Sequence, residues 1–121
     1  MSRKDELVAS GLHTSTASAI TGSITTGITA AGSTQATATA LTASVNVVST
    51  TAASTGVQLP NCQVGDSVEV YNQGADSLSV YPLTGENINA LSANAAFAVA
   101  AGKAATFRKV SALVWMSQLC A

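Results

Sequence analysis

Between Leu7 and Gly65 the chain carries no charged side chain and a single histidine, and it is built mainly from Thr, Ala, Ser and Gly. Enzyme surfaces and disordered tails both depend on Lys, Glu and Asp to stay solvated. An uncharged stretch of this length therefore indicates backbone that is covered. It belongs either to β-structure inside an oligomer or to an extended arm that pairs with another protein through main-chain hydrogen bonds. Both alternatives favour assembly over catalysis.

The apolar content of the chain predicts a thin core. Alanine supplies 23 residues, whereas Val, Ile, Leu, Met, Phe and Trp together number 30 among 121 residues. Burial of a large aliphatic side chain contributes about 1.5–3 kcal/mol and burial of alanine contributes much less. One domain of this length therefore has few large apolar side chains to bury. We expect neighbouring chains to add stability in a homo-oligomer.

Charge and hydropathy narrow the possible partners and locations. A net charge of −1 does not provide the basic patch that nucleic-acid binding needs. No run approaches the roughly 20 apolar residues of a membrane span, and Met1–Glu6 is not followed by the apolar core of a secretion signal. We therefore expect neither nucleic acid nor membrane as a partner, and synthesis in a cytoplasm. Cys62 and Cys120 either form a disulfide or are two buried thiols, and the cytoplasmic origin favours thiols.

The N-terminal residues read as a separate segment. A capped start and a glycine stop predict a helix of about two turns near residues 3–10. Ile20, Ile24 and Ile28 then recur at every fourth position, a spacing that suits one face of a helix or of a strand. The glycines and threonines around them favour the extended form. We predict that residues 1–34 form a docking arm whose three isoleucines contact a partner.

The remaining residues, 35–121, predict an all-β domain. Short alternating runs bounded by Gly and Pro indicate eight or nine strands, as in a β-sandwich or jelly-roll-like domain. The runs Asp66–Asn72 and Ser77–Pro82 flank a glycine-containing loop and predict a β-hairpin. Apolar residues occupy both faces of the last strand, so we predict that Val114 and Met116 lie in an oligomer interface.

No motif in the chain carries reaction chemistry. His13 has no acidic neighbour and is interpreted as a surface or docking residue. Gly102 and Lys103 depart from the phosphate-loop pattern and predict a turn. Tyr71 and Tyr81, expected on the outer face of the predicted hairpin, would either pack against each other or stack on a sugar. We predict no enzymatic activity, cofactor or metal.

Three segments carry a resemblance to a known group of proteins. Gly65–Pro82, Gly85–Leu91 and Asn94–Phe107, with a Trp on the last strand, resemble small virion proteins of tailed bacteriophages over roughly residues 56–118. The resemblance implies a capsid decoration or cement protein, typically a homotrimer, that sits on the virion surface and binds the major capsid protein. It implies no catalytic residues. A tail or fibre component and a carbohydrate-binding module displayed on the virion are the alternatives.

Overall fold

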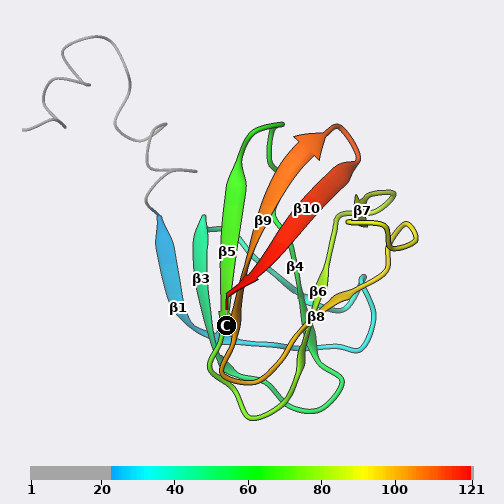
Figure 1. Cartoon of the computed structure of the whole chain (residues 1–121). Coiled ribbons are helices and arrows are strands. Elements are labelled where there is room, and N and C mark those ends of the chain that lie inside the picture. The colour runs from blue at the N-terminus through cyan, green and yellow to red at the C-terminus, as the bar shows by residue number, and fades with distance from the viewer. Residues whose placement is uncertain (1–22, 121) are drawn as a thin grey trace, which may run out of the picture.

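Short alternating runs fold into ten strands, and no helix occurs among residues 23–120, which are the residues that the computed structural model describes (Figure 1). The prediction of an all-β chain is confirmed. The predicted helix near residues 3–10, together with His13 and Ile20, lies outside the described residues. The strands are β1 (Ile24–Thr29), β2 (Thr39–Ala40), β3 (Val45–Thr50), β4 (Gly56–Gln58), β5 (Ser67–Asn72), β6 (Leu78–Tyr81), β7 (Asn87–Ile88), β8 (Phe97–Val99), β9 (Ala104–Ser111) and β10 (Val114–Cys120).

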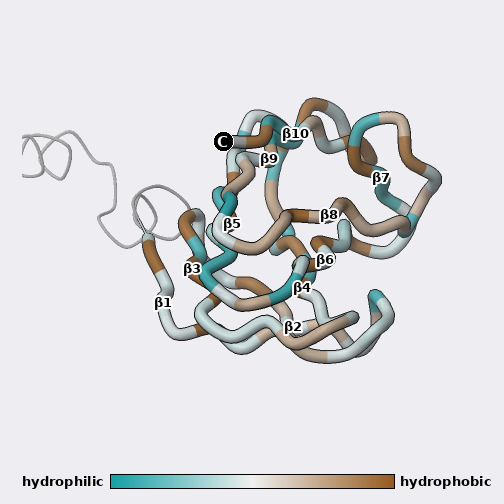
Figure 2. Tube along the Cα trace, turned by 60° about the horizontal axis from the view of Figure 1, so that its bottom comes forward, coloured by the Kyte–Doolittle hydropathy of each residue, from teal (hydrophilic) through white to brown (hydrophobic). Residues whose placement is uncertain are grey.

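The strands form two sheets that share one core. The six-stranded sheet has the order β1-β3-β5-β9-β10-β7, and the four-stranded sheet has the order β2-β4-β6-β8. Strands β1, β3 and β5 are parallel to one another, and so are β2, β4 and β6. The chain therefore alternates between the sheets and stacks turn upon turn, as a solenoid does. Antiparallel strands β8, β9 and β10 extend the sheets away from β1 and β2 (Figure 2). A jelly roll would instead be antiparallel throughout.

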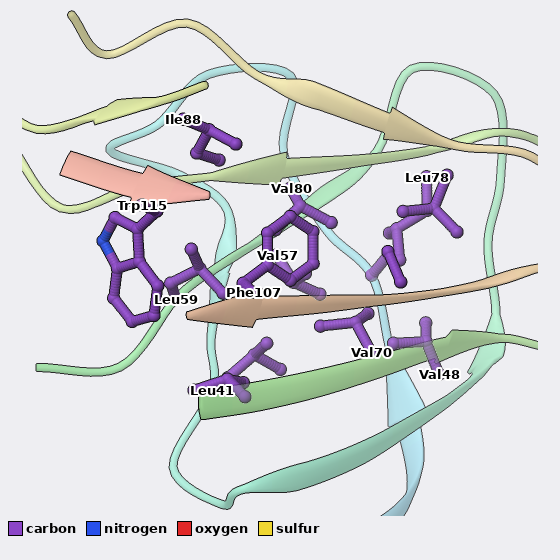
Figure 3. Packing of buried hydrophobic residues seen from close by; sticks show 14 of the residues in the cluster. Leu41, Val48, Val57, Leu59, Val70, Leu78, Val80, Ile88, Phe107 and Trp115 are labelled. Atoms are coloured by element: carbon purple, nitrogen blue, oxygen red, sulfur yellow. The ribbon is translucent and has the colours of Figure 1, made fainter. Parts of the chain in front are cut away.

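The core consists of the apolar residues that point inward from each strand. Phe107 of β9 lies among valines from both sheets (Figure 3), and the ring of Phe97 meets it edge to face at 5.5 Å between centroids. Trp115 of β10 is completely buried. Alternation of apolar and polar residues along β5, β6 and β9 directs every second side chain into this core, so the alternating pattern explains which face of each strand is covered.

The predicted hairpin of Asp66–Asn72 with Ser77–Pro82 is wrong. Its two runs are the strands β5 and β6, but β5 belongs to the six-stranded sheet and β6 to the four-stranded sheet. Val70 of β5 and Leu78 of β6 are both buried in the shared core. The chain covers both apolar faces by crossing from one sheet to the other, instead of pairing the two strands edge to edge.

Asn72 fixes the crossing between β5 and β6. Its Oδ1 accepts hydrogen bonds from the Thr51 hydroxyl at 2.8 Å and from the Gly74 amide at 3.0 Å. Its Nδ2 donates to the carbonyl oxygens of Asp76 and Val99, both at 2.9 Å. The side chain thus uses two donors and two acceptor positions while it is buried, which is the requirement for a polar group in a core.

The predicted boundary of the N-terminal arm at residue 34 is also wrong. Strand β1 pairs in parallel with β3, Ala30 is buried in the core, and Ile28 packs against it. The two-sheet fold therefore includes the described residues from 23 onward. The parallel partner of β1 follows a full turn of the chain later, and a uniform Thr, Ala and Gly composition gives no sign of such pairing.

Candidate interaction surface

The outward face of the six-stranded sheet carries apolar side chains at its β1 end. Residues paired in register point to the same face of a sheet, and the register pairs Ile24 with Val45 and Val47 with Tyr71. Ile24 is 62% exposed and Tyr71 39% exposed, whereas Val45 and Val47 are half-buried. These four residues form a continuous strip across β1, β3 and β5, which we call the β1 strip.

A second apolar group lies at the β10 end of the same face. Val110 and Met116 are about half exposed, and Val114 is half-buried on the same face of β10 as Met116. We call these three residues the β10 patch. It contains both residues for which an oligomer interface was predicted, Val114 and Met116, and the interface itself stays a prediction.

Charged side chains separate the β1 strip from the β10 patch. The Tyr71 hydroxyl donates a hydrogen bond to Glu69 Oε1 at 2.8 Å, and the Arg108 guanidinium donates to the Gly65 carbonyl oxygen at 2.9 Å. Apolar contact area bordered by a few polar groups is the usual composition of a protein–protein interface. The outward face of the six-stranded sheet therefore has the chemistry of a contact surface.

The three predicted arm isoleucines do not share one face. Ile20 lies outside the described residues, Ile24 points outward, and Ile28 points into the core. Thr25 pairs with Asn46 and Ile28 pairs with Val48, so β1 contains one more residue than β3 between these two pairs. Gly27, which lies in this interval, has a φ of +69°. Because one extra residue reverses which face a side chain occupies, the fourfold spacing does not keep Ile24 and Ile28 together.

A buried ion pair lies beneath the other end of this sheet. Lys109 Nζ lies 2.9 Å from Glu86 Oε2, and the Trp115 indole N–H donates to Glu86 Oε1 at 2.7 Å. The ammonium group also lies 5.7 Å from the centre of the Trp115 ring. Both carboxylate oxygens are engaged, so the cluster holds the segment before β7 against β9 and β10. Sequence reasoning missed it, although the inward alternation of Ala105 and Phe107 continues to Lys109.

Tyr71 and Tyr81 do not form the platform that the carbohydrate alternative requires. Tyr71 lies on β5 of the six-stranded sheet, and Tyr81 lies on β6 of the four-stranded sheet. The Tyr81 hydroxyl donates to the Ser33 carbonyl oxygen at 3.1 Å, which ties the turn before β2 to β6. The expected shared outer face depended on the hairpin, and it is lost together with the hairpin.

Cys62 is a free and buried thiol beside a cavity of about 70 Å³ that Thr42 and Val68 also line. Burial raises the pKa of the Cys62 thiol, the negative charges of Asp66 and Glu86 raise it further, and the positive charge of Lys109 opposes them. The thiolate is the reactive form of cysteine, so a raised pKa lowers reactivity in addition to the steric effect of burial.

We therefore expect Cys62 to be alkylated slowly in the folded protein. In a Cys120→Ser variant, native iodoacetamide labelling at pH 8 should be clearly slower than labelling in denaturant, because burial shields the Cys62 sulfur and the raised pKa lowers its thiolate fraction. Mass spectrometry measures the labelled fraction with time. Equal rates in both conditions would contradict the burial of this thiol.

Other kinds of site have little support among the described residues. Within residues 23–120 no three His, Cys, Asp or Glu side chains lie close enough to hold a metal ion. The same part of the chain has no helix with the length and hydropathy of a membrane span. No protein-family model, curated protein or solved structure matches this chain.

Proposed function

We propose that this chain is a non-enzymatic structural protein of a bacteriophage virion, which decorates the capsid and stabilises it by bridging capsid subunits. The observation that carries the proposal is the outward face of the six-stranded sheet, where the β1 strip and the β10 patch leave large apolar side chains exposed. Large apolar side chains that are grouped and exposed on one face commonly mark a protein–protein contact, where their burial would add to the stability that a thin core provides. The resemblance of residues 56–118 to phage virion proteins is the reason for proposing that the assembly is a virion.

The proposed mechanism divides the outward face between two contacts. Copies of the chain associate through the β10 patch, and the β1 strip, together with the residues that precede it, faces the major capsid protein. Joining several weak contacts in one oligomer raises the overall affinity well above that of each contact. The predicted trimer is one such oligomer, and its subunit number stays a prediction.

Binding to empty capsids tests the proposal directly. Purified full-length protein should cosediment with capsids that lack it and should appear at fixed lattice positions in electron micrographs. Binding to tails or fibres would replace the capsid assignment by the tail alternative. Binding to a glycan array without binding to particles would favour the carbohydrate alternative, and absence of all three would contradict a virion role.

Substitution in the β10 patch tests the predicted oligomer contact. Met116→Lys should weaken self-association and, through lost avidity, lower capsid affinity by at least about tenfold, because position 116 lies opposite Arg108 and the added positive charge would have no partner in a dry contact, which costs several kcal/mol. Ala53→Lys is the control, since Ala53 is exposed in the loop between β3 and β4, away from β9 and β10 in the sheet order. Sedimentation and capsid titration measure both effects. Equal behaviour of the two variants would show that the β10 patch is not a contact.

A further inference from the structure

Both sheets end in open edges at the same end of the molecule. Strand β1 is the terminal strand of the six-stranded sheet, and β2 is the terminal strand of the four-stranded sheet. Figure 2 shows the two strands on the side away from β10, with β1 at the end of one sheet and β2 at the end of the other. The first turn of the solenoid-like stack therefore presents two sheet edges, with no described residue paired beyond them.

The backbone of β1 has hydrogen-bonding groups available at this edge. The Ser23 carbonyl oxygen accepts a hydrogen bond from the Val45 amide at 3.0 Å, which directs the polar groups of Ser23 toward β3. Successive residues of a strand point their N–H and C=O groups in opposite directions. The backbone groups of Ile24 and Thr26 are therefore directed away from β3.

The usual protections of a sheet edge are scarce here. Native edges are commonly guarded by lysines, prolines, inward charges or bulges, because an unguarded edge pairs with other chains. From Ser23 to Leu59 the sequence has neither a charged residue nor a proline. The irregularity at Gly27 is the one such device on β1, and it leaves Ile24 to Thr26 as regular strand. The edge of β2 is protected by its length of only two residues, so Ile24 to Thr26 of β1 are the part of this end with the least protection.

We propose that a second copy of this chain covers this end, through antiparallel pairing of β1 with β1 of the other copy. A two-fold axis perpendicular to the sheets, placed at their open edges, brings each sheet edge against the same edge of the partner copy. Both sheets then continue across the contact, and Ile24 meets its equivalent on the outward face. The two β1 strips join into one apolar surface twice as long.

The double edge favours a second copy over a single bound strand. Sheets that pack face to face lie about 10 Å apart, so one extended peptide can pair with β1 or with β2 but not with both. A second copy carries two edges at the same separation and in the same relative direction. The absence of charge between Ser23 and Leu59 also removes the like-charge repulsion that identical surfaces otherwise have.

This inference concerns self-association alone and does not depend on virion binding. It uses a different surface from the β10 patch, so the two contacts can form in the same assembly. The test is therefore made in full-length protein that carries Met116→Lys, without capsids, so that its failure does not affect the proposed function. Sedimentation at rising concentration should show a reversible monomer–dimer equilibrium.

Two variants in this background test the edge. Thr26→Pro removes an outward amide and should raise the dimer dissociation constant at least about tenfold, since proline cannot donate to a sheet ladder. Ile24→Lys introduces the charge that guards natural edges and should have an effect of similar size. Leu91→Lys is the matched control, because Leu91 is 40% exposed in the loop after β7. Thermal melting should show that all three variants remain folded.

Hydrogen exchange identifies what covers the edge. The Ile24 and Thr26 amides should become protected as concentration rises, in step with dimer formation. Protection at every concentration in a monomer would overturn the proposal, because the chain's own preceding residues would then cover β1. A concentration-independent monomer with unprotected amides, or a dimer that none of the edge variants weakens, would overturn it as well.

Discussion

Lys109→Met is expected to lower the free energy of unfolding by about 3–5 kcal/mol, because it leaves the Glu86 carboxylate buried without its positive partner. Lys109 and Glu86 are each 6% exposed, and their charged atoms are 2.9 Å apart. Methionine fills a volume similar to that of the lysine stem, so a cavity does not account for the loss. Urea unfolding followed by the fluorescence of the single Trp measures the effect.

The double variant Glu86→Gln, Lys109→Met separates charge from packing. Glutamine keeps an acceptor for the Trp115 indole N–H and carries no charge, so much of the stability lost in Lys109→Met should return. Lys103→Met is the control, since Lys103 is exposed in the turn before β9. A double variant as unstable as Lys109→Met alone would mean that the ion pair is not the cause.

The sequence predicts the all-β class and many of the strands because these depend on local pattern. The alternation along Ser67–Asn72 and Leu78–Tyr81 can be read directly from the sequence. It correctly separates the buried valines and leucine from the polar positions. Strand pairing is not local. The same turn residues can connect two strands of a hairpin or two strands in different sheets. Which of these connections forms depends on which strand faces pack together in the core.

The candidate surface could be predicted only in part for the same reason. The outward exposure of Val114 and Met116 follows from a local signal, apolar residues on both faces of one strand, while their oligomer interface stays a prediction. Ile24 and Ile28 were grouped by a spacing that one irregularity at Gly27 cancels. Parallel pairing of β1 with β3 joins distant segments of similar Thr-rich composition, so no local feature of the sequence specifies its register.

Asn72→Leu is expected to destabilise the fold by about 2–6 kcal/mol, although leucine has nearly the same size and is more apolar. The substitution leaves the buried Thr51 hydroxyl and the Val99 carbonyl oxygen without the partners they have at 2.8 and 2.9 Å, and an unsatisfied buried polar group costs about 1–3 kcal/mol. The Gly74 amide and the Asp76 carbonyl oxygen also lose a partner, but they lie nearer to solvent, which can replace Asn72.

Thermal unfolding should show this loss as a fall of the midpoint by about 10 °C or more, because a domain of this size loses roughly 4–8 °C for each kcal/mol. Asn61→Leu provides the control, since Asn61 is exposed in the loop after β4 and should change the midpoint little. A small effect of Asn72→Leu would mean that the crossing from β5 to β6 is held by the apolar contacts of Val70 and Leu78 alone. A large effect would show that the buried hydrogen bonds of Asn72 hold the crossing from β5 to β6 in place, between two strands that the sequence pattern alone assigns to one hairpin.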